Sequence, residues 1–208
     1  MTQIGLTTLV NNALILLGST RRIESFDYGS LGSQASDLLA VLVPDLLAAH
    51  PWNFALCRAD VPRENLEPAL GDRPWRFQLP ADCLRWLPWD REDSNYFDAV
   101  EEGDRLLACT PDPICIRYIR NVQDPTKWSA GFRALLTAEI AYALAETVSE
   151  SQSQRDRMEQ KAEKAIRAAK RADGLASQTH KRLSPARASN AVRAMQGGGR
   201  GDPARSHR

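Results

Sequence analysis

Histidine is scarce in this sequence, which contains only three in 208 residues. His50 precedes a proline, while His180 and His207 lie near the C-terminus. A general base must be held within hydrogen-bonding reach of the group that it activates, so we expect neither a Ser-His-Asp nor a Cys-His site. The sequence also has no GxxxxGK(S/T) motif and no GxGxxG motif after a predicted strand. We therefore predict that the protein is not an enzyme and carries no cofactor.

Cysteine is also limited, and its spacing is uninformative. Cys57, Cys83, Cys109 and Cys115 form no CxxC pair, and no spacing of cysteine and histidine matches a zinc site. The N-terminus lacks the basic segment of a secretion signal, which favours reduced thiols in a reducing cytoplasm. No apolar run approaches the ~20 residues that a membrane-spanning helix needs. We expect a soluble protein with no metal and no membrane partner.

Charge is nearly balanced overall, at a formal +1, but it is unevenly distributed. Residues 175–208 contain seven Lys or Arg and one Asp, giving +6, so residues 1–174 carry −5. Few large apolar side chains occur after residue 174, and such a segment cannot bury enough surface to offset its ordering entropy. We predict an acidic folded body and a basic C-terminal arm that is extended and disordered in the free protein.

Apolar residues recur at helical spacing in the first and last parts of the body. The pattern predicts a helix over 6–17 and a second one from near Ser33 or Ser36 to about His50, with a kink or break at Pro44. It predicts a longer helical run over 124–173 in two parts, with Asp124 as N-cap and a second helix after a capping-box pattern at 151–154. In the second predicted helix we expect inward Leu38, Leu39, Leu42, Leu46 and Ala49.

The middle of the chain changes to a period of two. Apolar and polar residues alternate in short runs near 52–57, 75–79, 84–87, 96–100, 105–109 and 114–118, separated by Pro, Gly and Asp. This pattern is typical of antiparallel strands, with a hairpin turn at residues 102–104. The predicted fold class is α+β: a bundle of about four helices from 1–51 and 124–174, an inserted sheet over 52–123 and an extended arm over 175–208.

One acidic cluster in the insertion allows a second hypothesis. Two carboxylates at a suitable separation can hydrolyse a glycosidic bond, so a glycan hydrolase is an alternative function. Solvated loop residues give the same pattern and are commoner. The cluster consists of Asp90, Glu92, Asp93, Asp98, Glu101, Glu102 and Asp104.

The basic arm allows three interpretations. It can be an inert, solubilising end, or it can neutralise nucleic-acid phosphates without reading sequence. It can also dock on another protein and fold as it binds. Aromatic side chains for base stacking are not interleaved with the arginines, which favours protein docking over nucleic-acid binding. Sequence physics alone does not choose among the three.

Several short sequence blocks, taken in their order and spacing over residues 4–173, resemble those of a known protein family. They are Asn12–Ser19, Arg22–Ser25, Pro51–Ala55 with Arg58, Phe77–Arg85, Phe132–Leu136 and Ile140–Ala145. Together these blocks resemble the tail tubular protein A family of tailed bacteriophages. The resemblance implies a head-to-tail adaptor, also called a connector or gatekeeper protein, in which a helical bundle carries a β insertion.

In that family twelve copies form a ring below the portal, and the ring joins the capsid to the tail nozzle. The resemblance thus implies a structural virion protein, assembled in the host cytoplasm, whose partners are the portal protein, the tail nozzle protein and copies of itself. DNA passes through the lumen without sequence-specific binding.

The resemblance also implies a role for the arm, because a C-terminal extension typically grips the portal in this family. The predicted docking residues are Lys181, Arg182, Leu183, Arg187, Val192, Arg193, Met195 and Arg200.

Overall fold

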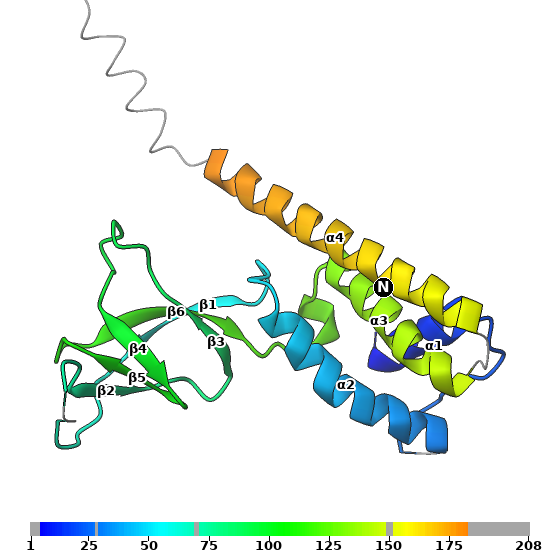
Figure 1. Ribbon diagram of the computed structural model, residues 1–208, viewed down its shortest axis with the longest axis horizontal. Coiled ribbons are helices and arrows are strands. Elements are labelled where there is room, and N and C mark those ends of the chain that lie inside the picture. Colours follow the sequence, from blue (N-terminus) through cyan, green and yellow to red (C-terminus); the bar gives the residue numbers. More distant parts are fainter. Residues whose placement is uncertain (1–4, 28, 69–70, 149–151, 183–208) are drawn as a thin grey trace, which may run out of the picture. The chain divides into compact units, whose positions relative to one another are not determined.

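The computed structural model describes residues 5–27, 29–68, 71–148 and 152–182. Within them lie four α-helices: α1 (Leu6–Leu16), α2 (Ser30–Ala48), α3 (Ala130–Val148) and α4 (Gln152–Arg182). The chain divides into two compact units, Met1–Asp173 and Gly174–Arg208. The predicted α+β class with about four helices is confirmed, because the helices accompany two small antiparallel sheets (Figure 1).

Helix α3 is the centre of the bundle. It packs against α1 and α2, and Figure 1 shows it between α2 and α4. Gly131 allows close approach to α4, because a Cβ at this position would lie only 3.3 Å from the Cα of Ala169. Among the described side chains of α3, only Ala130, Ala134 and Tyr142 are exposed. The apolar stripe predicted for this helix is buried at Phe132, Leu135, Leu136, Ile140 and Leu144.

Helix α1 follows its predicted pattern and ends where expected. It buries Leu9, Val10, Ala13 and Leu14. Gly18 then adopts a left-handed φ of 70°, a conformation that glycine takes without a Cβ clash and that commonly ends a helix.

Helix α2 differs from its prediction in two ways. It runs unbroken through Pro44. The lost hydrogen bond would have ended on the carbonyl of Ala40, which is an exposed residue. The prediction of a break was therefore wrong. The inward face was predicted only in part. Leu39 is buried as expected and Leu38, Leu42 and Leu46 are partly buried against the core, but Ala49 is exposed. The other buried hydrophobic residues of α2 are Ala35, Val43 and Leu47.

The run from Asp124 begins with a separate turn. Pro125–Lys127 form the 3-10 helix η1, and the carboxylate of Asp124 accepts a hydrogen bond from the Thr126 N–H at 2.9 Å. Helix α3 begins only at Ala130. The capping-box pattern at 151–154 lies partly outside the described residues.

Helix α4 continues to Arg182, nine residues past the end predicted at Asp173. A single glycine inside a helix costs only about 1 kcal/mol, so Gly174 does not stop it. The basic arm therefore begins with two helical turns rather than with an extended segment.

The insertion forms two three-stranded antiparallel sheets, where the sequence had suggested one. The first has the order β1-β6-β3, from β1 (Leu56–Val61), β6 (Ile114–Arg120) and β3 (Cys83–Leu87). The second has the order β2-β5-β4, from β2 (Trp75–Gln78), β5 (Arg105–Ala108) and β4 (Ala99–Glu102). The predicted hairpin at 102–104 is confirmed, since β4 pairs with β5 and Gly103 has a φ of 64°.

The first predicted strand was misplaced. The Trp52 carbonyl accepts hydrogen bonds from the N–H groups of both Ala55 and Leu56, so residues 52–55 form a turn and the strand starts at Leu56. The alternation of Trp52 and Phe54 has another cause, because both rings join an aromatic cluster around Phe132.

Two hydrophobic cores result, and β6 contributes to both. The helical core contains Ile119 and Val122, whereas the sheet core contains Ile114, Ile116 and Tyr118. Successive side chains of a strand point to opposite faces, so neighbouring positions of β6 face different cores.

Candidate functional site

Most of the predicted docking residues fall beyond the part of the chain that the structure describes. These are Leu183, Arg187, Val192, Arg193, Met195 and Arg200. Lys181 and Arg182 lie in the final turn of α4. The candidate functional site therefore comprises the surfaces of the folded body and the contacts that hold α4 in place.

A buried carboxylate fixes α4 at the end of the first unit. Asp173 is only 9% exposed, and its two oxygens lie 3.1 and 3.3 Å from the backbone nitrogen of Asn53, which donates to them. The Asn53 side-chain amide in turn donates to the Asp173 carbonyl at 2.8 Å. These bonds join α4 to the turn after α2, which belongs to the family-like block Pro51–Ala55.

His50 completes this junction. Its Nε2 lies 3.4 Å from an Asp173 oxygen, and its ring meets Trp52 edge-on at 4.6 Å between centroids. Burial lowers the pKa of His50 below its ordinary value, and the nearby cations Lys170 and Arg85 act in the same direction. Asp173 opposes this shift but does not overcome it, so the neutral imidazole is favoured in the folded protein.

This pKa direction predicts a dependence of stability on pH. The unfolded His50 binds a proton near pH 6.5 and the folded one only at lower pH, so stability is full above 6.5 and declines as pH falls through the folded pKa. Urea unfolding between pH 5 and 8 measures it. We expect His50→Gln to remove this component of the slope. An unchanged slope in the variant would assign the effect to other groups.

The outward side of α2 is apolar with an acidic edge. Asp37, Val41 and Asp45 are all exposed and follow at intervals of four residues, which places them along one side of the helix. Val41 is 60% exposed. Half-buried Leu38 and Leu42 flank this stripe. A cavity of about 170 Å³ opens next to it, lined by Leu6, Phe26, Ser36, Leu39, Ala40, Val43, Gln123 and Trp128.

Helix α2 is unusually apolar for a helix with so much exposed surface. Leu31–Ala48 is long and apolar enough to cross a membrane, although the core helix of a soluble protein meets the same criteria. Only 28% of this segment is buried. Its outward carboxylates, Asp37 and Asp45, would each cost roughly 2–3 kcal/mol in a bilayer interior. We therefore interpret the exposed apolar surface as one for protein contact.

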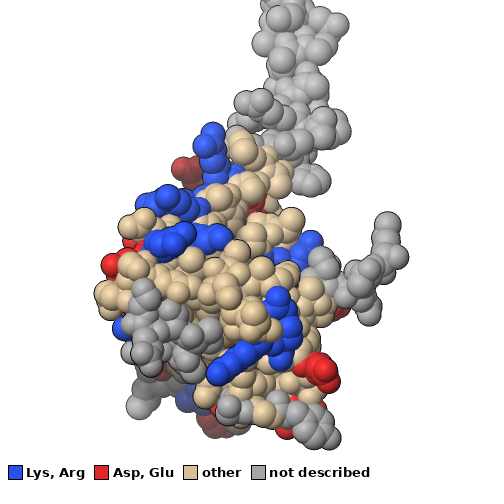
Figure 2. Space-filling model, turned by 90° about the vertical axis from the view of Figure 1, so that its right-hand side faces the viewer, with Lys and Arg blue, Asp and Glu red and all other residues tan. Residues whose placement is uncertain are grey.

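The outward side of α4 has the opposite charge. Exposed residues recur there every three or four positions, and four of the five are basic: Arg157, Gln160, Lys164, Arg167 and Arg171. Figure 2 shows Lys and Arg gathered over α4, beside a broad area of uncharged side chains. Glu163 pairs with Arg167 at 3.3 Å between exposed groups, and Asp156 and Glu159 are also exposed on this helix.

No protein-family model matches this chain, and no curated protein matches it either.

Three of the seven acidic residues, Asp93, Asp98 and Asp104, make local side-chain contacts. Asp98 accepts two hydrogen bonds from Arg73, at 2.9 and 3.1 Å, and Asp93 accepts from the Asn95 N–H at 2.9 Å. Glu101 and Glu102 are exposed on β4.

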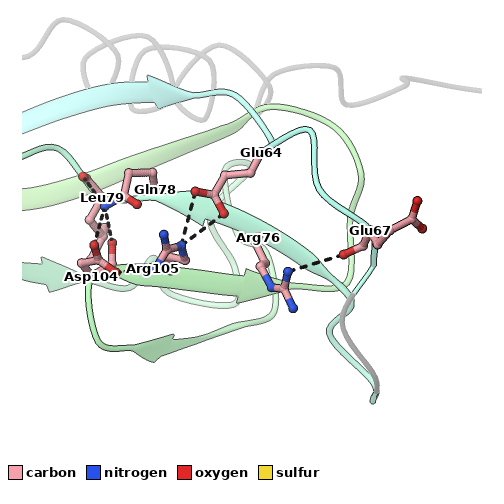
Figure 3. Close-up of polar contacts among 7 residues, drawn as sticks. All are labelled: Glu64, Glu67, Arg76, Gln78, Leu79, Asp104 and Arg105. Atoms are coloured by element: carbon pink, nitrogen blue, oxygen red, sulfur yellow. Dashed lines mark hydrogen bonds and ion pairs between the residues drawn. The ribbon is translucent and has the colours of Figure 1, made fainter.

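Asp104 is held in a polar cluster on the second sheet (Figure 3). Gln78 donates to it at 3.0 Å and Arg105 at 2.8 Å, and Arg105 also pairs with Glu64 at 3.2 Å. The hydrogen bond from Gln78, followed by the charge of Arg105, lowers the pKa of Asp104. A glycosidase acid needs a raised pKa, so Asp104 does not have the electrostatics of that role.

A cavity of about 320 Å³ lies elsewhere in the insertion. None of the seven acidic residues belongs to its lining, which consists of Ser94, Asn95, Tyr96, Phe97, Thr110, Pro113, Ile114 and Cys115. Among the described residues, no group of three or more His, Cys, Asp or Glu side chains could hold a metal. The described geometry thus gives the hydrolase hypothesis no specific support.

Sequence reasoning missed the packing of Trp89. Its ring is 6% exposed, and the guanidinium carbons of Arg58 and Arg117 lie 5.1 and 4.9 Å from its centroid. Its Nε1 donates to the Cys115 carbonyl at 2.7 Å. Cation–π contacts of this kind stabilise by roughly 0.5–1 kcal/mol. No local pattern reveals them, because the three residues come from separate segments.

Proposed function

We propose that this chain is a head-to-tail adaptor of a tailed bacteriophage. In this role copies of the chain form a ring between the portal and the tail nozzle, and the C-terminal arm docks on the portal. It acts as a structural virion protein, and no catalytic role is part of the proposal. The family-like blocks motivate the proposal.

The observation that carries it is the pair of unlike surfaces on the bundle. The acidic, apolar side of α2 and the basic side of α4 belong to helices on opposite sides of α3 (Figure 1). A ring of identical subunits joined head to tail requires two different, complementary surfaces on each subunit. A twofold dimer requires only one self-complementary surface. The distribution of charge therefore favours the ring.

The arm supplies a second kind of contact. Residues 183–208 contain five arginines and one aspartate, and the preceding helix is anchored through Asp173. Several arms on one ring bind together, so that individually weak contacts add up through avidity. The net charge of −5 over residues 1–174 also suits a conduit for DNA, because like charge discourages phosphates from binding to the wall.

Mixing with the portal protein encoded in the same genome tests the proposal. The purified chain at micromolar concentration is combined with assembled portal, and mass photometry measures the mass added per portal ring. We expect a saturating addition of many copies, twelve if the resemblance holds, and negative-stain images with an extra ring on one face of the portal.

Two results would contradict the proposal. One is the absence of added mass at saturating chain concentration. The other is an equal affinity for any duplex DNA with a steep loss on raising the salt concentration, which would assign the cations of α4 and the arm to phosphate binding. A parallel titration with a duplex of unrelated sequence provides this comparison.

A further inference from the structure

We infer that the exposed side of α2 binds the basic side of α4 from a second copy of this chain. This inference names the self-contact of the proposed ring and so rests on the proposed function. The surface of α2, the surface of α4 and the poorer fit of other occupants support it.

The α2 surface is suited to a helix that bears cations. Asp37 and Asp45 are two turns apart, about 12 Å along the axis, and exposed Val41 lies midway between them. Helix α2 contains no Lys or Arg. A partner helix can therefore contact the apolar centre while its cations reach a carboxylate at either end.

The α4 surface has a matching spacing. Lys164 and Arg171 are seven residues apart, about 10.5 Å along the axis, and Arg167 and exposed Ala168 lie between them. The small side chain of Ala168 leaves room for Val41. The two charge separations differ by roughly 1.5 Å, which long Lys and Arg side chains can span.

Other occupants fit this surface less well. A second α2 would place carboxylates opposite carboxylates, and like-charge juxtaposition is costly in an interface. The α4 of the same chain lies on the other side of α3 (Figure 1). The basic segment 183–208 satisfies the charge, but its large apolar side chains are limited to Leu183, Val192 and Met195.

The size of the contact sets the conditions of the test. A face of 19 residues is about 28 Å long and about 10 Å wide, hence roughly 300 Å² per partner. A stable interface usually buries about 800 Å² per partner. A single α2–α4 contact is therefore weak, so it must be captured covalently or at high concentration.

A photo-cross-linker provides this capture. Val41 is replaced by p-benzoylphenylalanine in an isotopically light chain, which is mixed at about 0.2 mM with heavy wild-type chain, irradiated and mapped by mass spectrometry. We expect light-to-heavy links to residues 157–171. Ile15, which is 53% exposed against 60% for Val41, carries the same cross-linker as the matched control and should give few links to α4.

Charge reversal tests the electrostatic part. We expect K164E/R171E in the heavy chain to lower the Val41 cross-link yield roughly tenfold. Adding D37K/D45K to the light chain should restore it against that partner. All four positions are exposed, so the variants should fold, and circular dichroism checks this.

Three results would overturn the inference: links no more frequent than those from Ile15, links mainly to a second α2, or links mainly to residues 183–208. The inference and the proposed function can fail separately. Inter-copy links to α4 without portal binding would leave the contact standing and reject the adaptor. Rings on the portal without such links would reject the α2–α4 contact and leave the adaptor function standing.

Discussion

Removal of residues 183–208 is expected to reduce binding to the portal at least about 100-fold, because the avidity of several arms is lost together. The fold should persist, since both hydrophobic cores lie within residues 9–169. Truncation after Arg182 keeps α4 whole, unlike a cut at 175. Mass photometry of portal mixtures measures the binding, and urea unfolding measures the stability.

A charge-only variant provides the control for this deletion. Substitution of Arg187, Arg193 and Arg200 by glutamine keeps the length of the arm and removes three of its cations. If charge dominates docking, the triple variant should lose most of the affinity that the deletion loses. Full portal binding by the truncated chain would remove the arm from the mechanism and would shift attention to the surfaces of the body.

The second large effect is expected from Trp52→Ala, which should destabilise the protein by about 3–5 kcal/mol. The Trp52 side chain is 1% exposed, and its ring lies 5.2 Å from that of Phe132 between centroids. Its Nε1 donates to the Leu46 carbonyl at 2.8 Å, a bond that the substitution also removes. The shift of the urea midpoint, at unchanged slope, measures the loss.

Two companion variants locate the cause. Trp52→Phe keeps most of the ring contact and loses the hydrogen bond, so it should cost less than the alanine variant. Tyr96→Ala removes an aromatic ring that is 38% exposed and should change stability by no more than about 0.5 kcal/mol. A loss below 1 kcal/mol for Trp52→Ala would mean that the turn after α2 does not belong to the core.

The sequence was most informative where local pattern and burial agree. The apolar spacing in α1 and α3 predicted both helices and their buried residues. The alternation around Gly103 predicted a hairpin, since a tight turn there needs a left-handed residue. In each of these segments one face packs against a single hydrophobic core, so the spacing of the apolar residues is regular.

Where two causes compete, the prediction was wrong or silent. In α2, leucines occur on several sides, so the periodicity alone could not identify the inward one. At Trp52 and Phe54 the alternation came from aromatic packing in a turn. The contact of Asn53 with Asp173 spans 120 residues, and no local signal encodes it. The surfaces proposed for assembly have no local signal either, since they depend on which helices lie on opposite sides of α3.

The contribution of β6 to both hydrophobic cores has a consequence for protein engineering. Ile119 belongs to the helical core and its neighbour Tyr118 to the sheet core, so residues 52–123 are not a detachable cassette. Excising them and bridging the gap with a short linker would strip the helices of Ile119 and Val122 and leave a hole in their interior. Grafts of new loops should instead replace the turn at Gly103, where an added Cβ would meet no atom within 4 Å.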